Sequence, residues 1–172
     1  MLLYVNEYKV TNEKEVEIVK EHLEEYLSKE KLIIVDHEGQ PISQEGLSQL
    51  LLENVSELRL AAKSTSVMLR EFKEELVSYI QNVETYIERM RENENFSDVL
   101  NGFIQVTEAL LQFSSVEAFL QKSLVDQEQL NDLSTKALMR AKEGNYEYVL
   151  DLLEYELLAI LYHFLDETNE VM

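Results

Sequence analysis

The chain has 172 residues, 45% of them hydrophobic, and carries a formal net charge of −19 at pH 7 with no cysteine and three histidines. Without cysteine, the chain has no disulfide bond, no thiolate nucleophile and no cysteine-ligated zinc or iron–sulfur centre. The excess of carboxylates repels phosphate groups, which argues against nucleic-acid binding and against attachment to anionic membranes.

The acidic residues are concentrated toward the C-terminus, because eight Asp or Glu residues follow Lys142 and no Lys or Arg does. A basic protein partner is compatible with this distribution, although a solvated acidic surface is the simpler interpretation. The first charged residue is Glu7, too early for the apolar region of a signal peptide, and no run reaches the roughly 20 apolar residues that span a bilayer. We therefore expect a cytoplasmic protein without membrane insertion.

The first part of the chain alternates strand-like and helix-like segments. Residues 2–10 predict a strand, and Asn12 with Glu15 forms a capping pair for a helix that continues to about residue 29. The β-branched run 32–35 predicts a second strand, which ends in a turn at 36–39 and has a possible returning arm at 40–42. A short helix then ends near Asn54, a residue that tolerates left-handed backbone.

Residues 55–63 are ambiguous, but apolar residues alternate there with Arg59 and Ala61, which favours a strand over a continued helix. The order is then strand, helix, strand, strand, helix, strand. We predict a small α+β unit over residues 1–63.

The remainder, residues 64–172, has the apolar periodicity of long helices. Ser64, Thr65 and Ser66 are capping residues, and the first helix ends at residues 93–95. Its apolar stripe follows steps of three and four through Leu69, Phe72, Leu76, Tyr79, Val83, Tyr86 and Met90, and Ile80 and Ile87 widen it.

Three more helices follow, with a less regular region at 114–127. Ser97 can cap the second helix, Gly144 ends the third, and Asn145 can cap the fourth. In the second helix the expected core positions are Leu100, Phe103, Thr107 and Leu110, with Ile104 and Leu111 beside them. In the third helix they are Leu130, Leu133, Ala137 and Ala141. In the fourth helix they include Val149, Leu152, Leu153, Leu157, Ile160 and Phe164.

These patterns predict an α+β, predominantly helical protein. A small strand/helix unit at 1–63 precedes an up-and-down bundle of about four antiparallel helices at 64–172, because short connections join antiparallel neighbours. The heptads change from helix to helix, which argues against one long coiled coil.

The chain has no recognisable catalytic or metal-binding motif. A di-iron bundle needs a glutamate three residues before each ligating histidine, and those positions hold Val19, Ile34 and Ile160. Phosphate-binding loops and nucleophile elbows are also missing from the sequence. We therefore predict no catalytic residue, no metal site and no cofactor.

Two histidine neighbourhoods have ordinary explanations. His163 precedes Asp166 and Glu167 by three and four residues, which predicts an ion pair on one helix face rather than a proton carrier. The segment 36–38, Asp-His-Glu, lies at a predicted turn and lacks a fourth ligand, so we expect turn chemistry there rather than metal binding.

The fourth helix has the most unusual pattern. Tyrosines recur every seven residues at Tyr148, Tyr155 and Tyr162, and residues 157–161 are apolar around the whole circumference. Such a helix is either buried by its neighbours or binds another chain. The sequence predicts a candidate interaction face of Tyr148, Tyr155, Leu158 and Tyr162, and the alternative is a central helix surrounded by the rest of the protein.

In general character, a small acidic helical bundle resembles bacterial export chaperones, including those that serve flagellar subunits, and also acidic immunity or antitoxin proteins. We predict a non-enzymatic protein–protein interaction module, chaperone-like or an adaptor, that binds a protein client or itself. The alternatives are a structural or oligomeric accessory subunit, an acidic immunity or antitoxin-like protein and, least favoured, an enzyme or small-ligand-binding bundle.

Overall fold

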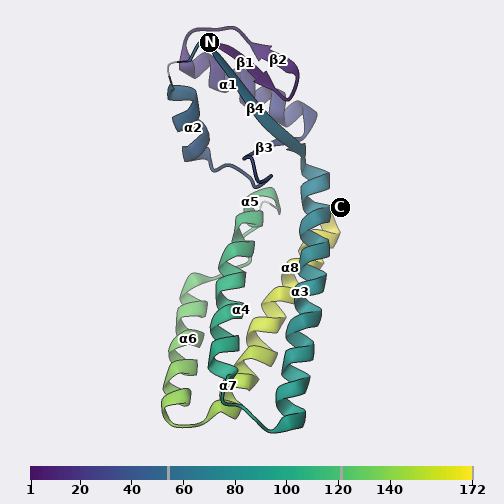
Figure 1. Cartoon of the computed structure of the whole chain (residues 1–172), viewed down its shortest axis with the longest axis vertical. Coiled ribbons are helices and arrows are strands. Elements are labelled where there is room, and N and C mark those ends of the chain that lie inside the picture. The colour runs from purple at the N-terminus through teal and green to yellow at the C-terminus, as the bar shows by residue number, and fades with distance from the viewer. Residues whose placement is uncertain (54, 121, 172) are drawn as a thin grey trace. The chain divides into compact units, whose positions relative to one another are not determined.

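The computed structural model describes residues 1–53, 55–120 and 122–171, and the chain divides into two compact units, residues 1–68 and 69–172. A four-stranded sheet with two helices is followed by a series of helices (Figure 1), which confirms the α+β, predominantly helical fold class. The predicted boundary after Lys63 lies near the end of the last strand, whereas the observed division follows Met68. The first turn of the next helix belongs to the N-terminal unit, where the Thr65 N–H donates to the Lys31 carbonyl at 2.9 Å.

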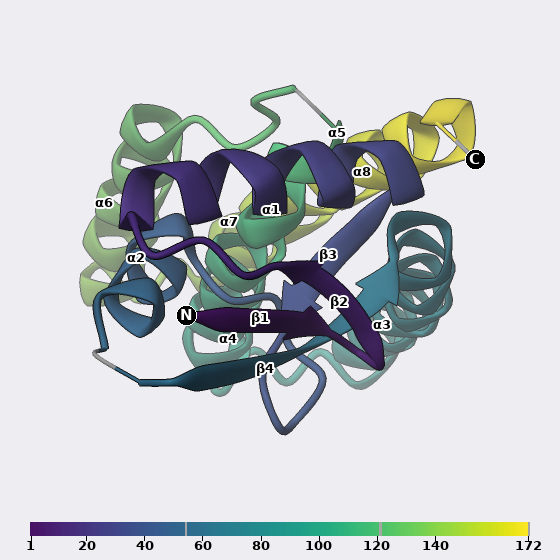
Figure 2. The ribbon, with the colours of Figure 1, turned by 90° about the horizontal axis from the view of Figure 1, so that it is seen from above.

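The N-terminal sheet contains β1 (Leu2–Val5), β2 (Tyr8–Thr11), β3 (Leu32–Val35) and β4 (Glu57–Ser64), in the order β2-β1-β4-β3. The central β1 and β4 are parallel, and both outer pairs are antiparallel. Helix α1 (Val16–Glu30) lies across one face (Figure 2), and α2 (Gln44–Leu52) contacts it. The core of this unit contains Leu3, Val5, Val19, Leu23, Ile34, Leu51 and Leu60.

The structure corrects two predictions in this unit. Residues 2–10 form a hairpin rather than one strand, because Asn6 adopts left-handed backbone (φ 55°) and reverses the chain. The Asn6 side chain also accepts a hydrogen bond from the Ala62 N–H at 2.9 Å, which ties this turn to β4. Helix α1 begins at Val16 rather than after Asn12, with Glu15 at the N-cap and no side-chain cap.

Of the ambiguous residues 55–63, those from Glu57 onward belong to β4 (Glu57–Ser64), as alternation predicts. The returning arm at 40–42 is reduced to a single bridge between Val35 and Pro41. The expected helix end at Asn54 lies outside the described residues, and α2 ends at Leu52.

The second unit is a bundle of four long helical segments, shown in Figure 1. These are α3 (Thr65–Asn93), α4 (Val99–Phe113), α6 (Gln127–Lys142) and a continuous last helix. That helix consists of α7 (Tyr146–Leu152), the π-helical turn η2 (Leu153–Leu157) and α8 (Leu158–Val171). Between α4 and α6 lie η1 (Ser114–Val116) and α5 (Glu117–Leu120).

The ends of α6 and α7 follow the predicted chemistry. Gly144 adopts φ 75°, and the Asn145 side chain accepts the Tyr148 N–H at 3.2 Å. The start of α4 does not, because Asp98 rather than Ser97 occupies the N-cap. The ring of Phe72 on α3 makes edge-to-face contacts with Phe113 on α4 and Phe164 on α8, with ring centres 5.5 Å and 6.3 Å apart. These contacts join three helices in the core.

In α4 the buried stripe is displaced by one residue from the predicted one. Phe103 and Leu110 are buried as expected, and the other buried positions are Val99, Val106 and Phe113. Ile104 and Leu111, predicted beside the core, are 42% and 45% exposed. The apolar surface of α4 therefore extends from the core into solvent.

Candidate interaction surface

The four residues of the predicted interaction face lie in different surroundings. Tyr148 is half-buried, with the Arg140 guanidinium 4.9 Å from the centre of its ring. Leu158 is half-buried against the bundle core. Tyr162 is 40% exposed, and its hydroxyl donates to the Glu84 carboxylate on α3. Tyr155 is 66% exposed.

The π-helical turn explains why these residues separate. A π turn has one more residue than an α turn, so it rotates the following helix by about 100° relative to a continuous α-helix. Because η2 lies between Tyr148 and Tyr162, their separation of fourteen residues, two steps of seven, no longer places them on one side. Tyr155 and Tyr162 remain exposed, with Ala159 between them, and they are the part of the predicted face that stays a prediction.

The apolar circumference of this last helix is mostly covered by its own bundle. Leu157, Leu161 and Phe164 are fully buried. Leu158, Ile160 and Leu165 are partly buried and pack against the same core. Ile160 was predicted as a core position, but the fully buried residue at this level of the helix is Leu161. This difference of one residue agrees with the shift of register that η2 introduces.

Most carboxylates of the last helix have partners within the bundle. The Arg91 guanidinium lies 2.5 Å from Asp151, 2.6 Å from Glu154 and 3.9 Å from Glu147. Its pKa is raised above the ordinary value, chiefly by hydrogen bonds to Asp151 and then Glu154. The Arg91 cluster thus fastens the C-terminal end of α3 to the start of the last helix.

Two other cations complete the pairing. Lys122 contacts Glu167 and lies 3.2 Å from Glu170, and Arg140 lies 2.9 Å from Glu143. Six of the eight acids after Lys142 are therefore paired. Within the described part of the chain, the other two, Glu156 and Asp166, have no ion pair.

The predicted pairing of His163 does not form. His163 is exposed and, among the described residues, has no carboxylate within 4.0 Å, because Glu167 contacts Lys122 instead. At the turn after β3, the Asp36 carboxylate accepts the N–H groups of Gln40 (2.8 Å) and Glu38 (2.9 Å). These hydrogen bonds, that from Gln40 above all, lower the pKa of Asp36. Asp36 thus stabilises its own turn, as the turn interpretation expects.

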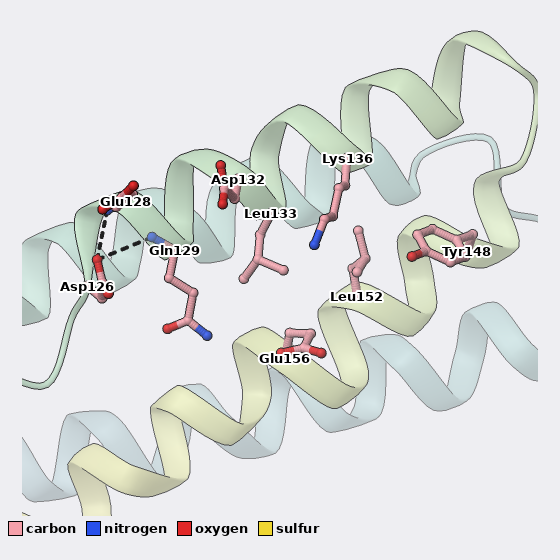
Figure 3. Close-up of a pocket in the computed structure, with 9 residues that line it drawn as sticks. All are labelled: Asp126, Glu128, Gln129, Asp132, Leu133, Lys136, Tyr148, Leu152 and Glu156. Carbon is pink, nitrogen blue, oxygen red and sulfur yellow. Dashed lines mark hydrogen bonds between the residues drawn. The ribbon is translucent and has the colours of Figure 1, made fainter.

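A polar groove of about 380 Å³ lies between α6 and the α7–η2 segment. Figure 3 shows Lys136 and Gln129 directed from α6 toward the opposite helix, which contributes Leu152 and Glu156. Its other lining residues are Asp126, Glu128, Asp132, Leu133 and Tyr148. The Asp126 carboxylate caps α6 by accepting the Glu128 and Gln129 N–H groups. With Lys136 among carboxylates in an open groove, the arrangement is that of a solvated surface between helices.

The other side of α6 forms a different surface with α4. A small apolar groove of about 120 Å³ between them is lined by Leu100, Phe103, Ile104, Thr107, Glu108, Ser134 and Leu138. Leu138 and Met139 on α6 are 47% and 58% exposed, comparable to Ile104 and Leu111 on α4. We call these four exposed residues, together with Leu100, Thr107 and Ser134, the α4–α6 face.

The α4 side of this face is almost free of charge. The exposed residues of α4 are Asn101, Ile104, Gln105, Glu108, Leu111 and Gln112, and only Glu108 is ionised. The exposed side of α3 is the opposite, with charged residues at Arg70, Glu71, Glu74, Glu75, Glu88, Arg89 and Glu92. In a chain with 28% charged residues, a helix with uncharged polar and aliphatic side chains toward solvent is unusual. Protein interfaces have this depletion of charge at their centre.

The α4–α6 face was not predicted from the sequence, because Ile104 and Leu111 were expected beside the core positions of α4 rather than in solvent. The available signal was the charge content of residues 99–113, where Glu108 is the single ionised side chain. A helix packed on one side only needs solvating residues on the other. Their scarcity in α4 was therefore as informative as the apolar circumference of the last helix.

Comparison of this chain with models of protein families, with curated proteins and with solved structures finds no match. Across residues 1–53, 55–120 and 122–171, no group of three or more acidic or histidine side chains is arranged to hold a metal ion. None of the helices in that part of the chain combines the length and apolar character needed to cross a membrane.

Proposed function

We propose that this chain is a non-enzymatic interaction module that binds a protein partner through the α4–α6 face. The observation that carries the proposal is the exposure of Ile104, Leu111, Leu138 and Met139 on two adjacent helices, of which α4 exposes a single charged residue, Glu108. A cluster of exposed aliphatic residues rimmed by polar ones is typical of a protein-binding surface. A cysteine-free chain suits a reducing compartment such as the cytoplasm.

The arrangement of charges favours this proposal over an immunity or antitoxin-like role. Such a role depends on free carboxylates that meet a basic partner. Here Arg91, Lys122 and Arg140 already engage Glu143 and five acids of the last helix. An apolar contact on α4 and α6 leaves those pairs intact, so it requires no rearrangement of the bundle.

The test is affinity purification from the native organism with mass spectrometry, using wild type and the double variant Ile104→Glu/Leu138→Glu. Glutamate is a good helix former, so the variant should fold while placing two charges on the face. We expect a specific protein partner with wild type and its loss with the double variant.

Two matched controls place charge elsewhere. Leu52→Glu alters an exposed leucine of the N-terminal unit, 69% exposed, and Tyr155→Glu alters the exposed side of the last helix. Both should retain the partner. If the double variant retains the partner and Tyr155→Glu loses it, the binding surface is the tyrosine side and the α4–α6 assignment is wrong.

A further inference from the structure

Resting on that proposed function, we infer that the partner of the α4–α6 face is a second copy of this chain, bound with its α6 antiparallel to the first α6. This names the partner and the orientation of the complex. The inference comes from the order of charges along α6 and from the position of the uncharged surface on a strongly acidic protein.

Electrostatic repulsion limits which surfaces of two copies can meet. Two chains of formal charge −19 repel each other wherever carboxylates approach. The solvent side of α3 and the exposed side of the last helix both contain carboxylates, as at Glu74 and Asp166. The α4–α6 face is a surface on which two copies can approach with Glu108 as the single acid contributed by α4.

The second step concerns the solvent ridge of α6. Residues Glu128, Asp132, Thr135, Met139 and Lys142 are all exposed and follow steps of four and three, opposite the buried stripe of α6. The N-terminal half of the ridge is therefore acidic. The C-terminal half contains Met139 and the basic Lys142, while Lys136 is directed toward the last helix.

This order is self-complementary. A twofold axis makes contacts reciprocal, so an antiparallel pair centred near Thr135 places Glu128 of each α6 beside Lys142 of the other. Within the residues that the structure describes, Glu128, Asp132 and Lys142 have no ion pair in the monomer. Their charges are available for such a contact.

The third step concerns the apolar residues. In this orientation Leu138 and Met139 of one copy lie at the level of Leu111 on the other, because α4 and α6 run antiparallel and Leu100, Ile104 and Thr107 share a groove with Ser134 and Leu138. Aliphatic residues at the centre and charges toward the ends of the paired helices are the usual arrangement of an interface. The same contact covers the exposed aliphatic residues of both copies at once.

The first experiment is sedimentation equilibrium on the purified full chain. Wild type should have twice the 20.1 kDa mass of one chain at micromolar concentration. Leu138→Glu should weaken self-association by about 30-fold or more, the range of a central interface residue. Leu52→Glu should leave self-association unchanged.

The second experiment exchanges the charges of the ridge. Glu128→Lys/Asp132→Lys makes the whole ridge basic, which should weaken self-association by at least about tenfold. Adding Lys142→Glu reverses the order of charges along the ridge, and adding Lys136→Glu returns the net charge to that of wild type. This four-residue variant should regain self-association, although it shares none of the original ion pairs. Circular dichroism and thermal unfolding establish that each variant is folded.

The outcomes separate this inference from the proposed function. A wild type that stays monomeric at about 100 μM, a concentration on the order of the dissociation constants of weak dimers, overturns the second-copy inference. In that case, a different protein partner that is lost with Leu138→Glu would still support the proposed function. A dimer insensitive to Leu138→Glu but broken by Tyr155→Ala overturns the inference in favour of the tyrosine side. Failure of the four-residue exchange to restore the dimer overturns the antiparallel orientation.

Discussion

Helix α4 and the last helix are both rich in apolar residues, and they use them differently. The last helix has apolar residues on every side around Leu157 to Leu161, yet neighbouring helices cover most of them. Helix α4 has a regular stripe, yet Ile104 and Leu111 remain in solvent. The comparison shows that apolar content alone does not identify a binding surface. The deciding property is what solvates the side of a helix that its neighbours leave uncovered.

The difference between the two helices is tested most directly by truncating one leucine in each. Leu161 is fully buried, so Leu161→Ala should lower the free energy of unfolding by about 2–5 kcal/mol through lost burial and a cavity. Leu111→Ala should change it by less than about 0.5 kcal/mol, because the side chain is exposed. Urea unfolding in a Leu138→Glu background removes any contribution of self-association. Equal effects of the two truncations would show that α4 is not exposed as described.

The second prediction concerns the contact between α3 and α4. A Cβ at Gly102 would lie 2.7 Å from the Tyr86 hydroxyl oxygen and 2.8 Å from its ring carbons. Gly102→Ala should therefore lower the free energy of unfolding by about 1–2 kcal/mol, since the displacement of Tyr86 outweighs the better helix propensity of alanine.

A Tyr86→Ala background provides the control for this prediction. Without the ring, the same Gly102→Ala change should raise stability by up to about 1 kcal/mol, because only helix propensity remains. Thermal unfolding of the four proteins measures both effects. An unchanged sign in the Tyr86→Ala background would contradict the close approach.

The third prediction tests the pairing that keeps the last helix in the bundle. Arg91→Met removes the guanidinium but keeps apolar contact, and should lower the free energy of unfolding by about 1 kcal/mol, since its partners are partly exposed and screened by solvent. Arg89→Met is the control, because Arg89 lies two residues before Arg91 and therefore on a different side of α3. It should have little effect. The difference should shrink in 1 M salt, where the Debye length is about 3 Å. A salt-independent loss would point to packing rather than charge.

The smallest expected effect distinguishes the two exposed tyrosines. Tyr162→Phe removes the hydrogen bond to Glu84 and should lower the free energy of unfolding by about 0.5 kcal/mol, whereas Tyr155→Phe should be neutral. The hydrogen bond to Glu84 raises the pKa of Tyr162 above its ordinary value.

The pH dependence follows from the direction of that shift. A pKa that is higher in the folded state stabilises the fold below about pH 10 and loses this contribution as the pH rises through the raised pKa. The difference between wild type and Tyr162→Phe should therefore be constant near neutral pH and diminish in alkaline solution. A difference that grows with pH would contradict the assignment.

The bundle was predictable where local chemistry and periodicity agree. In α6, the buried Leu130, Leu133, Ala137 and Ala141 and the turn at Gly144 follow from the sequence, because capping residues and spacing point to the same boundaries. The hairpin at residues 2–11 was missed because its reversal depends on left-handed backbone at Asn6, in a segment that otherwise reads as continuous.

The candidate surface was less predictable than the fold. One displaced residue in the α4 stripe decides whether Ile104 lies in the core or in solvent, and that displacement depends on which helices pack beside it. The position of Tyr148 relative to Tyr162 depends on η2, and no residue between 153 and 157 predicts a π-helical turn from the sequence. Tertiary packing, rather than local preference, determines both.

The π-helical turn also makes the length of the last helix consequential. Because a π turn holds one more residue than an α turn, deleting one residue between 153 and 157 would restore an unbroken α-helix and leave the following residues on the sides that they now occupy. Leu161 and Phe164 would still be directed toward the interior. The last helix should therefore tolerate the loss of a single residue from this turn better than the same loss elsewhere along its length, where every following side chain would rotate by about 100°.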